Sequence, residues 1–481
     1  MNRREFLQLS GAAALVSPRA QPSPAAPLTD DRFQAIAAVV RDAMTRYHVP
    51  GVALGVWHAD QLHLRGFGVT SVDDPRPITA DTLFTIASIS KTMTATAVMK
   101  LVEQGTLELH SPVHEVLPGF RVRDQAATAQ VTPWHLLTHT PGWEGQLTTE
   151  DRGAEALAHF VSSIMPTLPQ LAAPGETWSY NNAGFALSGR LIETLTGRGI
   201  HDALRELVFA PLGLTSTFTR LTDVLTHPVT LGHRELDGRT EVIRPFQTTS
   251  STTAGGVVTS LSDLMRYARF HLGDGRAGDG SQYLQRPRLA QMQRGQVPKH
   301  GTDDEMGIGW HVRRLGGTTT LAHGGTLNGH CLLVQLVPAH GLAFAVLTNH
   351  VEGWRLVQDV EHAVLKRYAD ATLAPGQRIG HRGVNEAMSL HSMPLATQPP
   401  LAEYVGQYAR PPVGEVVVRR DGSRLVVATG GGQPEAAVVF YGPDVAYAVS
   451  GAYTGMPFEF VRDGGGAVRW IRVNGRIARR T

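Results

Sequence analysis

Ser88 and Lys91, a serine and a lysine three residues apart, are the pair in this 481-residue sequence best suited to chemistry. An extended segment, residues 82–86, leads into residues 88–103, whose apolar pattern predicts a buried helix. Residues three apart on a helix share a face, so the amine would reach the hydroxyl. Burial lowers the pKa of a lysine, and a neutral amine can take the proton from a serine that attacks a carbonyl. N–H groups at the helix start can stabilise the resulting oxyanion.

Lysine is scarce in this chain, which makes each one informative. Lysine and arginine total 44 residues, but only four are lysines: Lys91, Lys100, Lys299 and Lys366. Arginine keeps its proton in proteins, whereas lysine can lose it when its surroundings lower its pKa. The sequence contains one Ser-x-x-Lys, and its alternative interpretation is a helix-start serine followed by an exposed lysine.

A second motif, Tyr180-Asn181-Asn182, follows the turn signal Pro174-Gly175. A loop that presents a phenol and an amide two residues apart can point both into a cleft. The phenol can relay a proton if cations lower its pKa, and the amide of Asn182 can hold a substrate carbonyl. Taken alone, the motif is equally consistent with a turn that contains a packed tyrosine.

A third motif, His323-Gly324-Gly325, ends a predicted strand. Two glycines allow a substrate backbone to lie close to the strand edge. The N–H of Thr326 can complete an oxyanion hole with that of Ser88. We therefore name His323, Gly324, Gly325 and Thr326 as candidate substrate-binding residues. A second His-x-Gly, at residues 381–383, lacks a strand context.

The three motifs, in this order, resemble those of the β-lactamase-related and penicillin-binding serine hydrolases, most nearly class C β-lactamases, D-aminopeptidases and related esterases. The segment PWHLLTHTPG at residues 133–142 is similar to the family segment HLLTHTSG, with Pro141 in place of serine. Residues 211–214 (PLGL) and 254–256 (AGG) also resemble family landmarks. The resemblance covers about residues 30–370.

The resemblance implies a role for each matched residue. Ser88 is the implied nucleophile, Lys91 the proton acceptor, Tyr180 the general acid or base, and Asn182 a substrate contact. His323 stands where many members have lysine, and histidine is neutral or charged near pH 7, so it holds a carboxylate less reliably. This departure favours a broader amide or ester hydrolase over a β-lactamase or carboxypeptidase.

The elements that must position these residues indicate an α+β fold. Residues 30–47 show helical periodicity, residues 51–57 and 61–69 predict a hairpin, residues 110–270 are mainly helical, and residues 309–350 predict consecutive strands. A sheet built from both ends of the domain and flanked by helices, with a mainly helical subdomain, satisfies this order. The predicted strands of the closing run are residues 309–313, 318–322, 329–337 and 342–349.

The chain divides into four predicted parts. Residues 1–27 indicate a twin-arginine-type signal, because Arg3 and Arg4 precede a short apolar stretch; a disordered basic N-terminus is the alternative. Residues 28–370 form the hydrolase domain, and residues 371–400 form a linker. Residues 401–481, with short alternating runs and Gly-rich turns, predict a small antiparallel barrel or sandwich. They are similar to the lipocalin-like domain that some members append, and this resemblance favours the β-barrel. Five strands are expected there: residues 415–418, 424–427, 437–440, 458–461 and 470–473.

Composition limits the partners. The net charge of +2 gives no reason to expect nucleic acid or an acidic membrane surface, and no other apolar run approaches the ~18 residues of a membrane span. His135 and His139, four apart, would suit a metal, but neighbouring prolines and the lack of a third ligand favour packing. We expect no cofactor and no metal, and no Gly-x-Ser-x-Gly elbow is present.

The sequence therefore predicts an exported, periplasmic or extracellular serine hydrolase that cleaves the amide or ester carbonyl of a small molecule or peptide through an acyl-enzyme. A β-lactamase or D-Ala-D-Ala carboxypeptidase of the same fold is one alternative. A non-catalytic protein that binds acylated or peptidoglycan-like ligands is a second, and a histidine-based metal hydrolase is a third. The substrate and the oligomeric state stay open.

Overall fold

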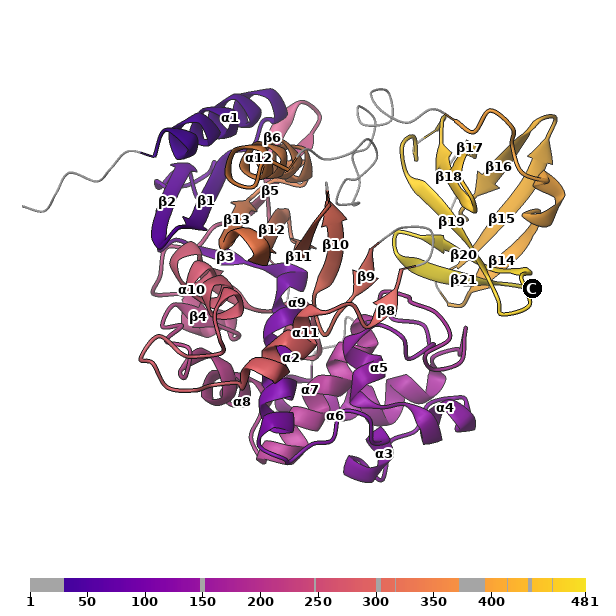
Figure 1. Ribbon diagram of the computed structural model, residues 1–481, viewed down its shortest axis with the longest axis horizontal. Coiled ribbons are helices and arrows are strands. Elements are labelled where there is room, and N and C mark those ends of the chain that lie inside the picture. The colour runs from indigo at the N-terminus through magenta and orange to yellow at the C-terminus, as the bar shows by residue number, and fades with distance from the viewer. Residues whose placement is uncertain are drawn as a thin grey trace, which may run out of the picture.

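The chain folds into a helix-covered sheet, a helical region and a closed barrel (Figure 1). The computed structural model describes residues 30–147, 152–245, 248–299, 304–315, 317–371, 394–412, 414–430, 435–451 and 453–481. The predicted signal, residues 1–27, and most of the predicted linker lie outside these residues.

The central sheet is antiparallel and joins strands from the two ends of residues 30–371. Its eight strands are ordered β2-β1-β13-β12-β11-β10-β9-β8, so the N-terminal hairpin pairs directly with the last strand of this segment. The strands are β1 (Gly51–His58), β2 (Gln61–Gly68), β8 (Val297–Pro298), β9 (Glu305–Met306), β10 (His311–Leu315), β11 (Thr318–Leu327), β12 (His330–Val337) and β13 (Leu342–Thr348).

Helices cover both faces of this sheet. Successive side chains of a strand point to opposite faces, so neighbouring residues belong to different cores. Val52, Leu54 and Val56 of β1 pack with α1 (Asp31–Tyr47) and α12 (Gly353–Tyr368). Ala53 belongs instead to the larger core on the opposite face. That core includes α10 (Leu261–Leu272) and α2 (Ser90–Glu103).

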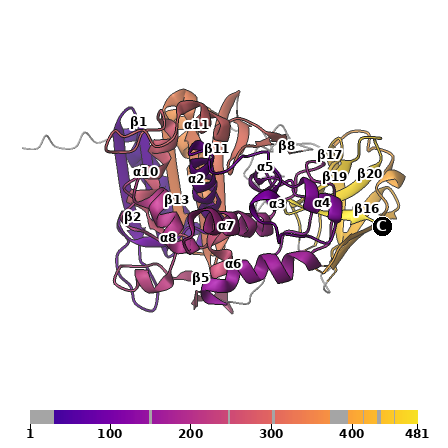
Figure 2. The same cartoon turned by 90° about the horizontal axis from the view of Figure 1, so that it is seen from below.

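The helical region lies beside the sheet and below it in the view of Figure 1, and Figure 2 shows it between the sheet and the barrel. Nearly every residue of α2 is buried, so this helix is the axis around which the region packs. The remaining helices are α3 (Val113–Val116), α4 (Gln125–Gln130), α5 (Pro133–Leu137), α6 (Ala156–His159), α7 (Asn182–Thr196), α8 (Ile200–Leu204), α9 (Thr252–Gly255) and α11 (Arg286–Gln293).

Residues 30–371 also form two small sheets. In one, β7 (Val258–Ser260) lies between β3 (Leu83–Thr85) and β4 (Thr217–Phe218). Strand β3 fixes the direction from which the chain enters α2. The other is a hairpin of β5 (Gly232–Leu236) and β6 (Arg239–Ile243).

The C-terminal part is a closed eight-stranded antiparallel barrel, because β14 pairs with β21 as well as with β15. Aromatic rings of Tyr404, Phe440 and Phe460 pack together within its core. Its strands are β14 (Gly406–Arg410), β15 (Gly414–Asp421), β16 (Arg424–Ala428), β17 (Ala436–Gly442), β18 (Val445–Ala448), β19 (Pro457–Arg462), β20 (Val468–Val473) and β21 (Arg476–Arg480).

The predicted α+β class with a helical subdomain and a C-terminal barrel is confirmed. Three barrel strands, β14, β18 and β21, were absent from the prediction. The single helix predicted over residues 88–103 is a 3₁₀ turn, Ala87–Ile89, followed by α2. Serine at the start of α2 favours such a change, because its hydroxyl bonds nearby backbone groups.

Candidate active site

Ser88 lies in the 3₁₀ turn between β3 and α2. The preceding residue, Ala87, adopts φ 49°, a left-handed conformation that non-glycine residues seldom adopt and that surrounding packing must hold. The Ser90 hydroxyl helps to stabilise this conformation of Ala87. It donates to the Ala87 carbonyl at 2.6 Å and accepts from the Val257 N–H at 3.0 Å. The turn thus presents the half-buried Ser88 side chain at the N-terminal end of α2.

Lys91 lies one turn further and points back at Ser88. Its Nζ donates to Ser88 Oγ at 3.3 Å and to the Ala254 carbonyl at 2.5 Å. The same nitrogen lies 4.8 Å from the ring centroid of Tyr180 and 5.5 Å from that of Phe185. Among the described residues, the contacts of this amine are thus with two rings, a carbonyl and the serine.

Burial sets the protonation of Lys91. The side chain is inaccessible to solvent, and this desolvation lowers its pKa well below the ordinary value, with a smaller contribution from the positive charge of Arg476. Among the described residues, no carboxylate acts to raise this pKa. A neutral Lys91 has a lone pair for the Ser88 proton, which a charged lysine lacks.

The Tyr180 loop is built by the cap of α7. Asn181 is the N-cap: its side-chain oxygen accepts from the Gly184 N–H at 2.8 Å, and its amide donates to the Trp143 carbonyl at 2.7 Å. The Asn181 N–H donates to His139 Nδ1 at 2.9 Å, and the His139 ring lies 4.5 Å from the Tyr180 ring. His139, the second histidine of the PWHLLTHTPG segment, therefore supports the tyrosine.

Burial raises the pKa of Tyr180 to about 12, although a hydrogen bond with Ser88 and the charge of Arg476 both act to lower it. The condition inferred from the sequence, that cations lower this pKa, is therefore not met, because desolvation of the phenolate outweighs the cation. Tyr180 stays protonated at neutral pH and can donate a proton, while Lys91 is the group able to accept one.

Asn182 is the first residue of α7. Its N–H donates to the Gly145 carbonyl at 3.0 Å. Its side-chain oxygen is buried, and no described residue donates a hydrogen bond to it. An unpaired buried amide oxygen is costly, so this atom is suited to a substrate N–H.

The His-Gly-Gly motif lies within β11 rather than at its end. Residues 323–327 pair with β12, whereas the pairing of β11 with β10 stops at Ala322. A Cβ at Gly325 would lie 2.5 Å from the Ile86 carbonyl oxygen, and one at Gly324 would lie 2.6 Å from the Trp354 ring. We expected these glycines to admit a substrate backbone, but the structure shows that packing against the protein already requires them.

His323 and Thr326 differ in their access to the cleft. His323 is only 2% exposed, its Nδ1 lies 2.7 Å from the Gly324 carbonyl, and its ring lies 5.1 Å from that of His311. Thr326 is exposed, and its hydroxyl accepts from Trp354 Nε1 at 2.7 Å. Strand β11 lies against the Ser88 turn. The role of the Thr326 N–H in an oxyanion hole stays a prediction.

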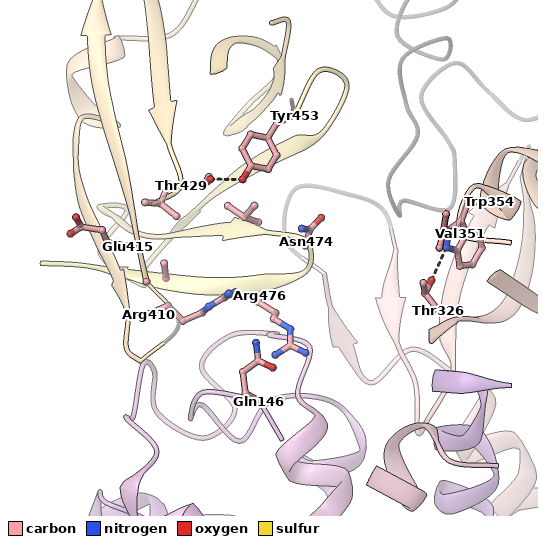
Figure 3. Close-up of a pocket in the computed structure, with 14 residues that line it drawn as sticks. Gln146, Thr326, Val351, Trp354, Arg410, Glu415, Thr429, Tyr453, Asn474 and Arg476 are labelled. Atoms are coloured by element: carbon pink, nitrogen blue, oxygen red, sulfur yellow. Dashed lines mark hydrogen bonds between the residues drawn. The ribbon is translucent and has the colours of Figure 1, made fainter. Parts of the chain in front are cut away.

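A pocket of about 620 Å³ separates the barrel from the sheet and the helical region, and its lining includes Thr326. Figure 3 shows Arg410 and Arg476 of the barrel side by side above Gln146, with Thr326 and Trp354 across the opening. Arg476 Nη1 lies 3.7 Å from the buried carboxylate of Glu144. Burial and the charge of Arg476 lower the pKa of Arg410. Sequence reasoning missed both arginines, and no motif marks them.

His135 and His139 do not share a site. His135 Nδ1 caps α5, 2.9 Å from the Thr132 hydroxyl, and burial lowers its pKa to about 4. His139 Nδ1 accepts from the Tyr180 loop, as described above. Across the described residues, no three His, Cys, Asp or Glu side chains gather to hold a metal ion. Each histidine has a structural partner of its own.

Comparisons with known proteins agree with this arrangement. The beta-lactamase family matches residues 36–368. Penicillin-binding protein 4 of Amycolatopsis lactamdurans is 36% identical over 313 residues, covering 63% of this chain and 82% of that protein. Unguisins hydrolase ungD′ of Aspergillus campestris is 23% identical over 432 residues, covering 82% of this chain and 79% of its own.

Solved structures extend the similarity through the barrel. SurE superposes with a TM-score of 0.77 at 25% identity, over 94% of this chain and 99% of its own. The structure of SurE with D-Leu gives a TM-score of 0.75 over the same share of this chain. The family match, the homologous penicillin-binding protein and the shared fold lead to one conclusion: the chain belongs to the β-lactamase family and is a serine hydrolase.

Proposed function

We propose that this chain is an exported hydrolase that cleaves amide or ester bonds of peptide-like substrates through an acyl-enzyme on Ser88. One observation carries the proposal: a fully buried Lys91 amine, with a pKa well below its ordinary value, lies 3.3 Å from Ser88 Oγ. Burial favours the uncharged form of such an amine, and the amine is adjacent to the hydroxyl that it must deprotonate.

Acylation follows from these protonation states. Ser88 Oγ attacks the substrate carbonyl carbon while its proton passes to Lys91 Nζ, and the carbonyl becomes an oxyanion. Collapse of this intermediate breaks the bond to the leaving nitrogen or oxygen. The Tyr180 phenol donates its proton to that atom and is reprotonated from Lys91, which returns both groups to their starting states.

Deacylation repeats these steps with water as the nucleophile. Water attacks the ester carbonyl of the acyl-enzyme, its proton passes to Lys91, and the Ser88 oxygen leaves with a proton from Tyr180. The net reaction adds one water across the amide or ester bond. The Asn182 side-chain oxygen, buried and without a partner among the described residues, supports a role in holding a substrate N–H.

The proposed substrate is a peptide or related acyl compound with a D-configured residue and a free carboxylate. SurE is similar over 94% of this chain, and one structure of SurE contains D-Leu. The buried His323 does not offer the exposed cation that a lysine would at that position. Two arginines, Arg410 and Arg476, line the pocket with one carboxylate, Glu415, so the lining has an excess of positive charge that favours a negatively charged group.

Export is proposed from the twin-arginine-type pattern of residues 1–27. Within the part of the chain that the structure describes, no helix combines the length and apolarity of a membrane span.

The decisive experiment captures the acyl-enzyme. We expect intact-mass spectrometry during turnover of p-nitrophenyl acetate to show one acetyl adduct, mapped by peptide digestion to Ser88. Ser88→Ala and Lys91→Ala should abolish both the adduct and turnover, a loss of at least about 10³-fold. Wild-type turnover in either variant would refute the proposal.

Lys100→Ala is the matched control for Lys91→Ala. Lys100 also lies on α2, donates to a carbonyl, Tyr283 O, at 2.7 Å, and covers a tyrosine ring at 4.7 Å. Its loss should leave turnover intact, because it lacks the serine partner. Nitrocefin hydrolysis would indicate the β-lactamase alternative, and labelling of Ser88 without turnover would indicate a non-catalytic binding protein.

A further inference from the structure

The barrel covers the loop that carries Tyr180 and bonds to its backbone. The Tyr180 N–H donates to the carbonyl of Gly475, in the turn between β20 and β21, at 2.8 Å. The Ile477 N–H donates to Ser179 Oγ at 3.2 Å. These bonds lie next to the phenol, on a loop whose neighbouring residues are already tied to His139.

Arg472 of β20 strengthens this contact from within the interface. Its side chain is 1% exposed, and Nη2 donates to the Trp178 carbonyl at 3.0 Å. The guanidinium also lies 5.2 Å from the Trp178 ring, and Nη1 donates to Glu459 at 2.5 Å. A buried guanidinium that is paired within the barrel is held in place, so it fixes the backbone two residues before Tyr180.

Gly475 brings the barrel into close contact with the same loop. It adopts φ +73°, and a Cβ there would lie 3.1 Å from the Trp178 ring and 3.7 Å from Tyr180 Cβ. Side chains tolerate neither this φ nor the shorter of these distances without movement. The glycine therefore allows the turn between β20 and β21 to sit against the tyrosine.

From these contacts we infer that the barrel forms part of the wall of the active site and contributes to catalysis. In this wall, Gly475 and Arg472 are positioning residues that hold the Tyr180 phenol toward Ser88. This inference rests on the proposed acid role of Tyr180. Packing of Trp470 and Ile477 against Leu171 and Ala172, with a bond from Trp470 Nε1 to the Leu171 carbonyl at 2.9 Å, extends the same interface along the loop.

The test replaces Gly475 by alanine and uses Gly238→Ala as its control. The two turns have nearly the same conformation: Asn474 and Gly475 have φ 51° and 73°, and Asp237 and Gly238 have φ 50° and 73°. Alanine thus strains both turns equally, but a Cβ at Gly238 meets open space. With p-nitrophenyl acetate we expect Gly475→Ala to lower kcat at least tenfold at unchanged KM, and Gly238→Ala to stay within twofold of wild type.

A double-mutant cycle separates positioning from general damage. If Gly475 acts through the phenol, Gly475→Ala should cause no further loss of kcat in a Tyr180→Phe background. Losses that multiply, or a wild-type kcat for Gly475→Ala, would overturn the inference. If that variant does not fold by circular dichroism, Arg472→Met replaces it in the same cycle, with partial recovery of kcat expected for Arg472→Lys.

The two proposals fail separately in this scheme. Turnover that survives Ser88→Ala would refute the proposed function. Turnover that is lost in Ser88→Ala but unchanged in Gly475→Ala, or in Arg472→Met where that variant replaces it, would refute the role of the barrel alone.

Discussion

Replacing Gly325 by alanine should slow catalysis by moving the Ser88 turn. Gly325 on β11 faces that turn, and a Cβ there would lie 2.5 Å from the Ile86 carbonyl oxygen and 3.0 Å from Ala87 Cβ. Both partners precede Ser88 directly in the chain. The added methyl group therefore pushes on the backbone that presents the nucleophile.

The size of the effect follows from the distances. Real Cβ atoms do not approach other atoms within 3.0 Å, and 3.4 Å is an ordinary contact, so the gap between β11 and the turn must widen by about 0.5 to 0.9 Å. A misplacement of about 1 Å costs roughly 10²-fold in rate. We expect kcat to fall by roughly 10- to 100-fold, and the overpacked core to lose about 1–3 kcal/mol of unfolding free energy.

Stopped-flow measurement of acetyl-enzyme formation from p-nitrophenyl acetate reports this rate, and urea unfolding reports the stability. Gly442→Ala is the control, because Gly442 also lies in a strand, has an ordinary φ, and has nothing within 4 Å of its Cβ. An acylation rate within twofold of wild type in Gly325→Ala, with the protein folded, would show that the turn does not need its observed position.

Three further results are expected. Because burial lowers the pKa of Lys91, kcat/KM should fall as the pH drops below that pKa and the amine gains a proton. Because the pKa of Tyr180 is about 12, kcat/KM should show no loss between pH 8 and about 10. A kcat/KM that still rises above pH 10 would show that Lys91 has the pKa of an ordinary lysine. Glu361→Ala should cost about 3–5 kcal/mol in urea unfolding, because it leaves the buried Arg313, bonded to it at 3.1 Å, without this carboxylate; a loss below 1 kcal/mol would contradict this. Asn181→Ala should cost about 1–2 kcal/mol by removing the cap of α7, and unchanged thermal unfolding would argue against that role.

Much of the fold was predictable because its signals are local. Continuous apolar runs predicted β1, β12 and β13 to within two residues at each end, and helical periodicity predicted α1 to within one. Barrel strand β21, Arg476–Arg480, escaped prediction because it is dominated by arginines. Arginines suit a strand whose outer face meets solvent and a neighbouring domain, and this context is absent from a short window of residues.

The candidate site divides in the same way. Ser88 and Lys91 are three residues apart in the chain, and helical geometry places residues with this separation on one face. The sequence was therefore sufficient to predict that this pair meets. The carbonyl that accepts from Lys91, on Ala254, lies 163 residues away, and the Trp178 carbonyl that Arg472 binds lies 294 residues from it.

Residue types and short spacings in the chain specified which groups are available: one hydroxyl, one amine, one phenol and the helix that aligns the first two. Tertiary contacts decided three other features: the protonation of these groups, the packing that requires Gly324 and Gly325, and the contribution of the barrel. The physical reason is that pKa depends on exclusion of water, and water is excluded only when distant segments close around the site.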